Sequence, residues 1–279
     1  ISVLLLCATT VTSYMERRYP MLEVNNVCVS FRSERQEKIF GTARNQVLFD
    51  VSLKVSQGTC LGILGESGSG KSTLGRVICG LLKPDTGEVK IQDVSVYASR
   101  NGRKNLQKRL SVVFQDYTTS ANPRFRVKEI IAEGLAARER NQKIRLNRAE
   151  ETSRLLELVG LNASYADRYP HELSGGQLQR VCIARAVACQ PEIILFDEAI
   201  SSLDAHTQVQ IMDLLHELKE KLGLTYIFIT HDLTSVTYLC DEVLFLYHGR
   251  ITEHIPVSRI AETKDEYAKK LLASIIEFD

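Results

Sequence analysis

Short apolar runs alternate with longer amphipathic stretches along most of the chain. The runs that read as strands cover residues 22–31, 47–55, 59–65, 88–96, 110–116, 192–199 and 225–230, and a closing hairpin covers 242–255. Helical periodicity is expected over residues 74–82, 127–161, 173–188, 206–223 and 232–240. Strands that alternate with helices predict a largely parallel α/β sheet. The almost continuous apolar runs at 59–65 and 192–199 are typical of strands buried on both faces.

Two polar stretches interrupt this pattern. Residues 32–46 are expected to form a loop, and a basic segment covers residues 99–109. Its cations are expected to form a solvated face, while contact with anionic lipid or a membrane partner is the alternative. They are Arg100, Arg103, Lys104, Lys108 and Arg109.

The first twenty residues stand apart from the rest. The apolar run 1–11 has about half of the roughly 20 residues that a membrane-spanning helix needs. No basic region precedes it, which disfavours a signal peptide. We expect translation to start naturally at Met15 or Met21, with residues 1–20 as an upstream segment.

Composition narrows the class of protein. The 279 residues are 44 % hydrophobic and 25 % charged, with a net charge of +1, which excludes intrinsic disorder and gives no charge-based reason to expect a nucleic-acid partner. The seven cysteines are scattered without a CxxC pair. They are expected to be free thiols of a cytosolic protein, rather than a disulfide framework or a zinc site.

A glycine-rich loop carries the first chemical signal. Residues 65–73 fit the pattern G-x-x-x-x-G-K-[ST] of a Walker A loop, between a buried strand and an amphipathic helix. Backbone N–H groups of such a loop cradle phosphates, Lys71 would bridge the β- and γ-phosphates of ATP or GTP, and Ser72 would offer its hydroxyl to Mg²⁺. The alternative is a turn that merely joins strand to helix. The nucleotide-binding residues are Gly65, Glu66, Ser67, Gly68, Ser69, Gly70, Lys71, Ser72 and Thr73.

Two carboxylates end the apolar strand at 192–199. Side chains of adjacent strand residues point in opposite directions, so Asp197 and Glu198 can perform different tasks. Asp197 would hold the Mg²⁺ shell, and Glu198 would polarise the attacking water as general base. The alternative is that both are ordinary solvated surface residues.

The most specific motif follows at Leu173–Gln177, LSGGQ. With it the chain resembles the ATPases of ABC transporters over residues 21–256. In that family this signature completes the nucleotide site of a neighbouring subunit, so that two domains sandwich two ATP molecules. The resemblance therefore assigns Ser174, Gly175, Gly176 and Gln177 to a site formed in trans.

Four further segments match this family. Gln115 resembles the Q-loop glutamine that reaches Mg²⁺ and water, which gives a predicted Mg²⁺ set of Ser72, Gln115 and Asp197. Asp204, in SSLD, resembles the D-loop, which links the two composite sites. His231 resembles the switch histidine at the γ-phosphate, so the predicted catalytic set is Glu198, His231 and Gln115. Phe31 fits the position where an aromatic ring stacks on adenine, although an ordinary core phenylalanine is the alternative.

The resemblance implies a fold and a domain plan. We expect a P-loop NTPase (RecA-like) core with a mostly parallel sheet, an antiparallel β subdomain and a helical insert over about 117–176. The ATPase domain would span residues 21–256. A short helical tail would follow over 257–279.

Within the family, the chain is most similar to ATPases of peptide and nickel importers. FQD followed by NPR at 122–124 is the stretch that resembles these importers, and Ala199 after Glu198 favours import of nickel or a chelated metal. Import of di- or oligopeptides is the alternative, and a soluble ABC ATPase without a transport role is disfavoured. With no cysteine after Cys240, the chain is most similar to the shorter of the two ATPase subunits that nickel importers pair. The implied partners are a second ATPase subunit (a paralogue), two permease subunits and an extracytoplasmic solute-binding protein. The implied location is the cytoplasmic face of the membrane, with ATP and Mg²⁺ as cofactors.

Overall fold

The computed structural model describes residues 20–32, 44–116 and 120–276, and within these ranges the strands form two sheets. The smaller sheet has the order β2-β1-β4-β5 and is antiparallel. Its strands are β1 (Pro20–Arg32), β2 (Arg44–Ser56), β4 (Thr86–Ile91) and β5 (Val94–Ser95). The expected start at Met15 and the remainder of residues 1–19 lie outside the described ranges.

The larger sheet positions the functional segments. Its order is β10-β9-β3-β8-β7-β6, and all neighbours are parallel except the closing β9–β10 hairpin. The largely parallel α/β sheet predicted from the sequence is therefore confirmed. The strands are β3 (Cys60–Leu64), β6 (Leu110–Phe114), β7 (Ile193–Asp197), β8 (Thr225–Thr230), β9 (Glu242–Tyr247) and β10 (Arg250–Pro256).

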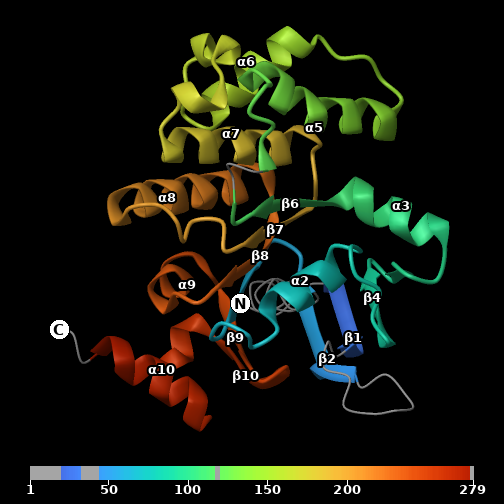
Figure 1. The fold of residues 1–279 in the computed structure, drawn as a ribbon, viewed down its shortest axis with the longest axis vertical. Helices are drawn as coiled ribbons and strands as arrows, with labels where there is room; N and C mark the ends of the chain where they lie inside the picture. Colours follow the sequence, from blue (N-terminus) through green and yellow to red (C-terminus); the bar gives the residue numbers. More distant parts are fainter. Residues whose placement is uncertain (1–19, 33–43, 117–119, 277–279) are drawn as a thin grey trace, which may run out of the picture.

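Strand alternation divides the interior into two hydrophobic cores. Ile193 and Leu195 of β7 join the core that contains α2 (Lys71–Ile78) and the antiparallel sheet, whereas Ile194 and Phe196 join the other core. The second core is built with α7 (Gly175–Ala188), α8 (Ala205–Leu222) and α9 (Leu233–Leu239) (Figure 1). Both faces of the parallel sheet are thus buried, as its continuous apolar strands require.

A helical layer lies beyond α7 at the top of Figure 1. It contains α5 (Val127–Gln142), α6 (Arg148–Leu158) and the short 3-10 helices η1 (Ala163–Asp167) and η2 (Pro170–Glu172). Gly134 of α5 allows a close approach to α7, because a Cβ atom there would lie 2.3 Å from the Arg185 carbonyl oxygen. The sequence suggested one helical stretch over 127–161, but it breaks after Lys143, which has a φ of 57°.

One other expectation is corrected, and one segment for which no element was predicted forms a helix. The strand expected over 88–96 is two strands, because Gln92 and Asp93 both adopt positive φ and turn the chain between β4 and β5. The basic segment is a helix, α3 (Arg100–Arg109), which Ser99 caps by accepting a hydrogen bond from the Gly102 N–H.

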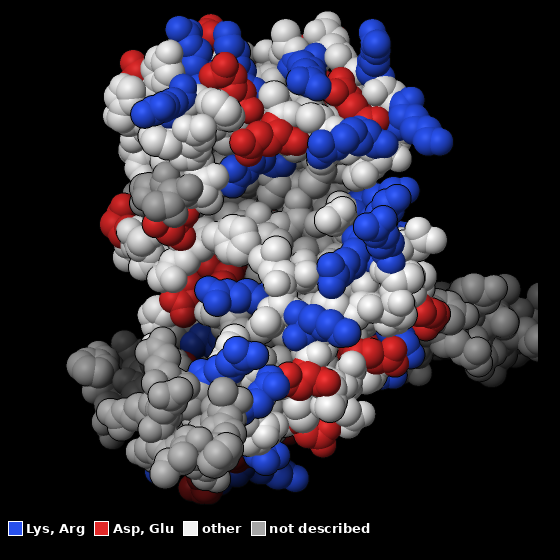
Figure 2. Space-filling model, turned by 45° about the vertical axis from the view of Figure 1, so that its right-hand side comes forward, with Lys and Arg blue, Asp and Glu red and all other residues white. Residues whose placement is uncertain are grey.

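The cations of α3 lie largely in solvent. Arg100, Arg103, Lys104 and Lys108 are exposed, and Arg109 pairs with Glu192. Figure 2, which brings the side of α3 forward, shows basic side chains on this surface. Their exposure is compatible with a solvated face and equally with contact to anionic lipid or a membrane partner.

The chain ends in a tail that returns to the parallel sheet. The 3-10 helix η3 (Val257–Glu262) leads into α10 (Glu266–Ile276), which lies beside β9 and β10 at the bottom of Figure 1. Tyr267 and Ala268 of α10 are buried.

Candidate active site

Four predicted segments meet at one edge of the parallel sheet. The glycine-rich loop follows β3, His231 follows β8, Asp197 and Glu198 end β7, and Gln115 follows β6. Since β3, β8, β7 and β6 are adjacent in that order, their carboxyl ends bring these segments side by side. This edge is the usual ligand site of an open α/β sheet.

The loop 65–70 is curled by its glycines and held by the β9–β10 turn. Gly68 and Gly70 have φ values of 82° and 105°, which a residue with a Cβ atom rarely adopts. Gly65 leaves no room for a side chain, because a Cβ atom would lie 2.3 Å from the Leu246 carbonyl oxygen. The Gly249 N–H donates to the Ser69 carbonyl oxygen at 2.9 Å. The loop is therefore a fixed cradle that opens directly onto the N-terminus of α2.

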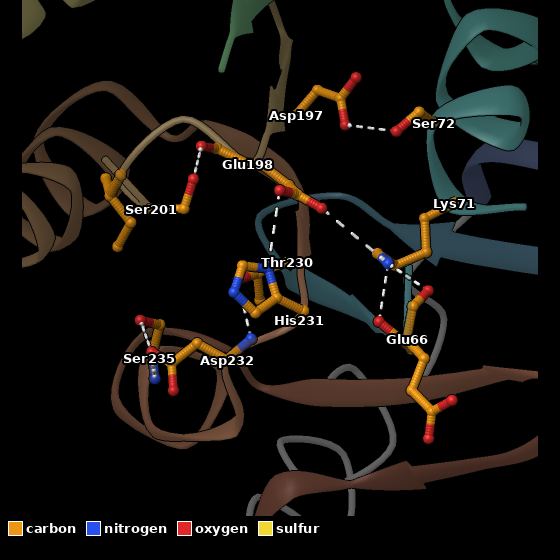
Figure 3. Close-up of polar contacts among 12 residues, drawn as sticks. Glu66, Lys71, Ser72, Asp197, Glu198, Ser201, Thr230, His231, Asp232 and Ser235 are labelled. Atoms are coloured by element: carbon orange, nitrogen blue, oxygen red, sulfur yellow. Dashed lines mark hydrogen bonds and ion pairs between the residues drawn. The ribbon is translucent and has the colours of Figure 1, made fainter. Parts of the chain in front are cut away.

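Lys71 is the first residue of α2, and only 4 % of its side chain is exposed. Its ammonium group donates to the carbonyl oxygens of Gly65 at 2.7 Å and Glu66 at 2.9 Å (Figure 3). Burial lowers the Lys71 pKa, and the negative charges of Glu198, Asp197 and Glu66 oppose that shift. The loop thus holds a buried cation at its mouth.

Asp197 and Glu198, at the end of β7, point to opposite sides and contact different groups. Asp197 continues the row of β7 side chains on the α2 face, where its Oδ1 lies 3.5 Å from the Ser72 hydroxyl. Burial and the neighbouring Glu198 charge raise the Asp197 pKa. Glu198 has a φ of 48° and turns to the other side, 3.9 Å from Lys71 Nζ and 3.6 Å from His231 Nδ1 (Figure 3).

The remaining residues of this edge are more exposed. His231 is 57 % exposed and immediately precedes Asp232, which caps α9 by accepting from the N–H groups of Thr234 and Ser235. Gln115 is exposed just beyond β6. Phe31 is 40 % exposed and lies opposite Asn45 in the β1–β2 pairing. Asn45 is two residues from Val47, and Val47 lines the loop cavity.

The cavity at the loop fits a phosphate group. It has a volume of about 330 Å³ and is lined by Val47, Ser67, Gly68, Gly70, Lys71, Ser72, Thr73 and Glu198. Among the described residues, the buried Ser69 hydroxyl has no hydrogen-bond partner, so the loop keeps a polar group unsatisfied. A buried cation, backbone N–H groups and a helix N-terminus match the oxygens of a phosphate chain. The Ser72 hydroxyl and the Asp197 carboxylate supply the oxygen ligands that Mg²⁺ prefers.

The signature residues lie elsewhere. Ser174 caps α7 in a reciprocal pair with Gln177, whose N–H donates to the serine hydroxyl and whose side-chain oxygen accepts from the Ser174 N–H. Ser174, Gly176 and Gln177 line a separate cavity of about 470 Å³ that also contains Thr207. Asp204 caps α8 by accepting from the Thr207 N–H at 2.9 Å. Across the described part of the chain, the residues lining this cavity include none of those lining the loop cavity.

Sequence reasoning missed three residues at this edge. Val47 lines the loop cavity, Tyr267 contacts the loop backbone, and Leu271 lines a neighbouring cavity with Glu198 and His231. A tyrosine and a leucine in an amphipathic helix carry no motif that would mark them. Their role depends on how the tail folds back.

Comparison with known proteins shows to which family this chain belongs. The family model described as ABC transporter matches residues 48–201. A metal-staphylopine import system ATP-binding protein of Staphylococcus aureus is 42 % identical over 258 residues, which cover 92 % of this chain and 100 % of that protein. An oligopeptide transport ATP-binding protein of Bacillus subtilis is 44 % identical over 231 residues, covering 81 % and 75 % respectively.

Solved structures agree with the sequence relatives. A dimeric ATP-binding cassette in a post-hydrolysis state with ADP and Pi matches with a TM-score of 0.73 and 29 % identity, over 85 % of this chain and 99 % of that one. A component of a Clostridium perfringens ABC transporter complex matches with the same TM-score and 25 % identity, over 93 % of this chain and 95 % of that one. Within the described residues, no helix is both long and apolar enough to cross a membrane. The chain belongs to the ABC transporter family and is an ATP-binding, ATP-hydrolysing member of it.

Proposed function

We propose that this chain is the subunit that energises an ABC importer, with a chelated metal as the cargo. The observation that carries the ATPase part is the meeting of Lys71, Glu198 and His231 at the carboxyl edge of one parallel sheet. The importer part rests on two relatives, which align with 92 % and 81 % of this chain. They are named for metal-staphylopine import and oligopeptide transport.

In the proposed mechanism, the loop 65–73 binds the phosphates of ATP. The backbone N–H groups of the loop would donate to phosphate oxygens, and Lys71 would keep its hydrogen bond to the Gly65 carbonyl while its other N–H groups reach the β- and γ-phosphates. Ser72, Asp197 and Gln115 would hold Mg²⁺, which neutralises charge on the phosphate oxygens when bound. Phe31, at the end of β1 beside β2, would stack on the adenine.

Hydrolysis would use the groups on the other side of the β7 end. Glu198 would orient and deprotonate the attacking water, and its contact with His231 supports this because the imidazole would fix the carboxylate and reach the γ-phosphate. Glu198 and His231 would therefore act at the γ-phosphate end of the nucleotide that the loop holds.

The separate cavity at the signature supports a site completed in trans. Ser174, Gly175, Gly176 and Gln177 would donate to the γ-phosphate held by a second ATPase subunit, and Asp204 would link the two sites. Binding of ATP would then close the pair, and hydrolysis would remove the shared contacts and shift the population back to open. We propose a paralogue as that second subunit.

The other proposed partners follow from the importer role. Two permease subunits would form the pore, and an extracytoplasmic binding protein would deliver the cargo. The chain would act at the cytoplasmic face of the membrane, with the helical insert over about 117–176 contacting the permeases.

Oligopeptide import is the second candidate, favoured by the 44 % identity to the Bacillus subtilis relative. Nickel as the specific metal stays a prediction. The cargo is tested by purifying the assembly from membranes in mild detergent and identifying the binding protein that accompanies it. Metal on that binding protein, measured by elemental mass spectrometry, supports the proposal, whereas a metal-free binding protein carrying peptide contradicts it.

A further inference from the structure

The C-terminal helix α10 reaches into the nucleotide edge of the sheet. The Glu66 backbone N–H donates a hydrogen bond of 2.9 Å to the Tyr267 hydroxyl, across 201 positions of sequence. Four residues later, Leu271 lines a cavity of about 430 Å³ together with Gly65, Glu66, Ser67, Glu198 and His231. The tail therefore borders the site that the proposed mechanism uses.

The peptide group between Gly65 and Glu66 is held on both sides. Its N–H belongs to Glu66 and donates to Tyr267, while its C=O belongs to Gly65 and accepts from Lys71 Nζ at 2.7 Å. A peptide unit is planar, so fixing the N–H direction also fixes the direction of the carbonyl. The Tyr267 hydroxyl thus sets the orientation of an oxygen that positions the loop lysine.

Tyr267 itself is held rigidly. It is 9 % exposed, and its ring stacks on Tyr247 of β9 with a centroid distance of 4.2 Å and an interplanar angle of 25°. Tyr247 lies two residues before Gly249, whose N–H holds the Ser69 carbonyl of the same loop. The tyrosine stack and the hairpin turn therefore support the loop from one side.

The start of α10 is anchored by one carboxylate. Glu253 of β10 accepts from the Thr263 hydroxyl and from the N–H groups of Lys264 and Asp265, the latter two at 3.1 Å. Asp265 in turn accepts from the Ala268 N–H at 3.0 Å. This set of hydrogen bonds fixes where Tyr267 enters the site.

We propose that Tyr267 is a positioning residue for ATP binding, acting through the Gly65–Glu66 peptide on Lys71. The inference rests on the proposed nucleotide site and extends it to the C-terminal tail. Tyr267 contacts neither Glu198 nor His231 in any hydrogen bond or ion pair of the described residues, so its effect falls on the binding of ATP rather than on the cleavage step.

The direct test removes only the hydroxyl. Tyr267→Phe keeps the ring stack, and the loss of one hydrogen bond predicts a Kd for ATP raised about three- to tenfold in the isolated chain. In the purified assembly, KM for ATP rises similarly while kcat at saturating ATP stays within about twofold. The matched control is Tyr238→Phe, which removes an exposed hydroxyl that donates to Asp213 at 2.5 Å and leaves both constants unchanged.

An unchanged affinity in Tyr267→Phe, or a fall in kcat with no change in KM, would overturn the inference. If this variant does not fold, Glu253→Gln carries the test, because it weakens the anchor of α10 and predicts a shift of the same sign. Lys71→Ala distinguishes a failure of the proposed nucleotide site from a failure of the Tyr267 inference. If wild type and Lys71→Ala bind ATP equally, the proposed site fails; if only Lys71→Ala loses ATP while Tyr267→Phe matches wild type, the inference alone fails.

Discussion

At the scale of single residues, the buried charge of Asp197 lowers the stability of the folded protein. Asp197 is an acid whose pKa is raised by burial and by Glu198, which means that its ionised form is disfavoured in the folded state. The folded chain then binds this proton more tightly than the unfolded chain. Stability falls as the pH rises from the ordinary value of 3.8 through the raised pKa, and the penalty persists at neutral pH.

Asp197→Asn should therefore stabilise the nucleotide-free chain. The neutral side chain keeps the shape and removes the charge, so we expect Tm at pH 7 to rise by roughly 1 to 3 °C. The gain should shrink as the pH is lowered toward 4. Differential scanning calorimetry without nucleotide or Mg²⁺ measures both effects, and a lower Tm than wild type at pH 7 would contradict this account of the site.

Lys71→Ala tests the cation of the loop. A charged hydrogen-bond donor to phosphate contributes about 10- to 100-fold to affinity, so Kd for ATP should rise by that factor. Titration with a fluorescent ATP analogue measures it. Lys104→Ala on the exposed face of α3 is the control, and nucleotide affinity close to wild type in Lys71→Ala would refute the assignment of the loop.

The sequence predicts most of this edge, because its residues are marked by short spacing motifs. Lys71 and Glu198 are each tied to a glycine pattern or to a strand end within a few residues. Tyr267 is different, since its contact with Glu66 depends on how a tail 201 positions away folds back. No local pattern carries that information.

At the scale of elements, the signature helix α7 faces a cavity of its own. Ser174→Arg fills that cavity with a large cation at the N-terminus of α7. We expect ATP hydrolysis in the assembly to be lost while the chain alone binds ATP as before, because the loop cavity is built from other residues. Ser258→Arg, at an exposed position in η3, is the control for adding the charge.

Hydrolysis rates in the assembly and ATP titration of the single chain check this prediction. If Ser174→Arg weakens ATP binding by the isolated chain, α7 is a local support of the loop and not half of a site formed in trans.

Element boundaries show where sequence patterns stop being informative. The alternation at 88–96 is compatible with one strand, and only the left-handed conformations of Gln92 and Asp93 divide it. The basic segment of α3 buries just Gly102 and Leu106, so its apolar periodicity is too sparse to indicate a helix.

At the scale of the whole molecule, the sequence predicts the class of fold but not the order of the strands. Buried strands that alternate with helices dictate a parallel sheet, and that sheet dictates one edge where its loops meet. The pairing order β10-β9-β3-β8-β7-β6 is not written in any single segment. It is this order that places the loop, His231 and the two carboxylates side by side.

We propose that this chain hydrolyses ATP with Glu198 as the general base and serves a membrane importer. The most direct measurement is the ATPase rate of the assembly purified from membranes, with wild-type chain, Glu198→Gln, or, as the control, Glu88→Gln at a partly exposed position of β4. Removing a general base lowers the hydrolysis rate at its own site by about 10²- to 10⁴-fold. Since a second ATPase subunit would keep its own base, Glu198→Gln should lower the total rate by at least half and leave ATP bound. A rate equal to that of wild type would contradict the account.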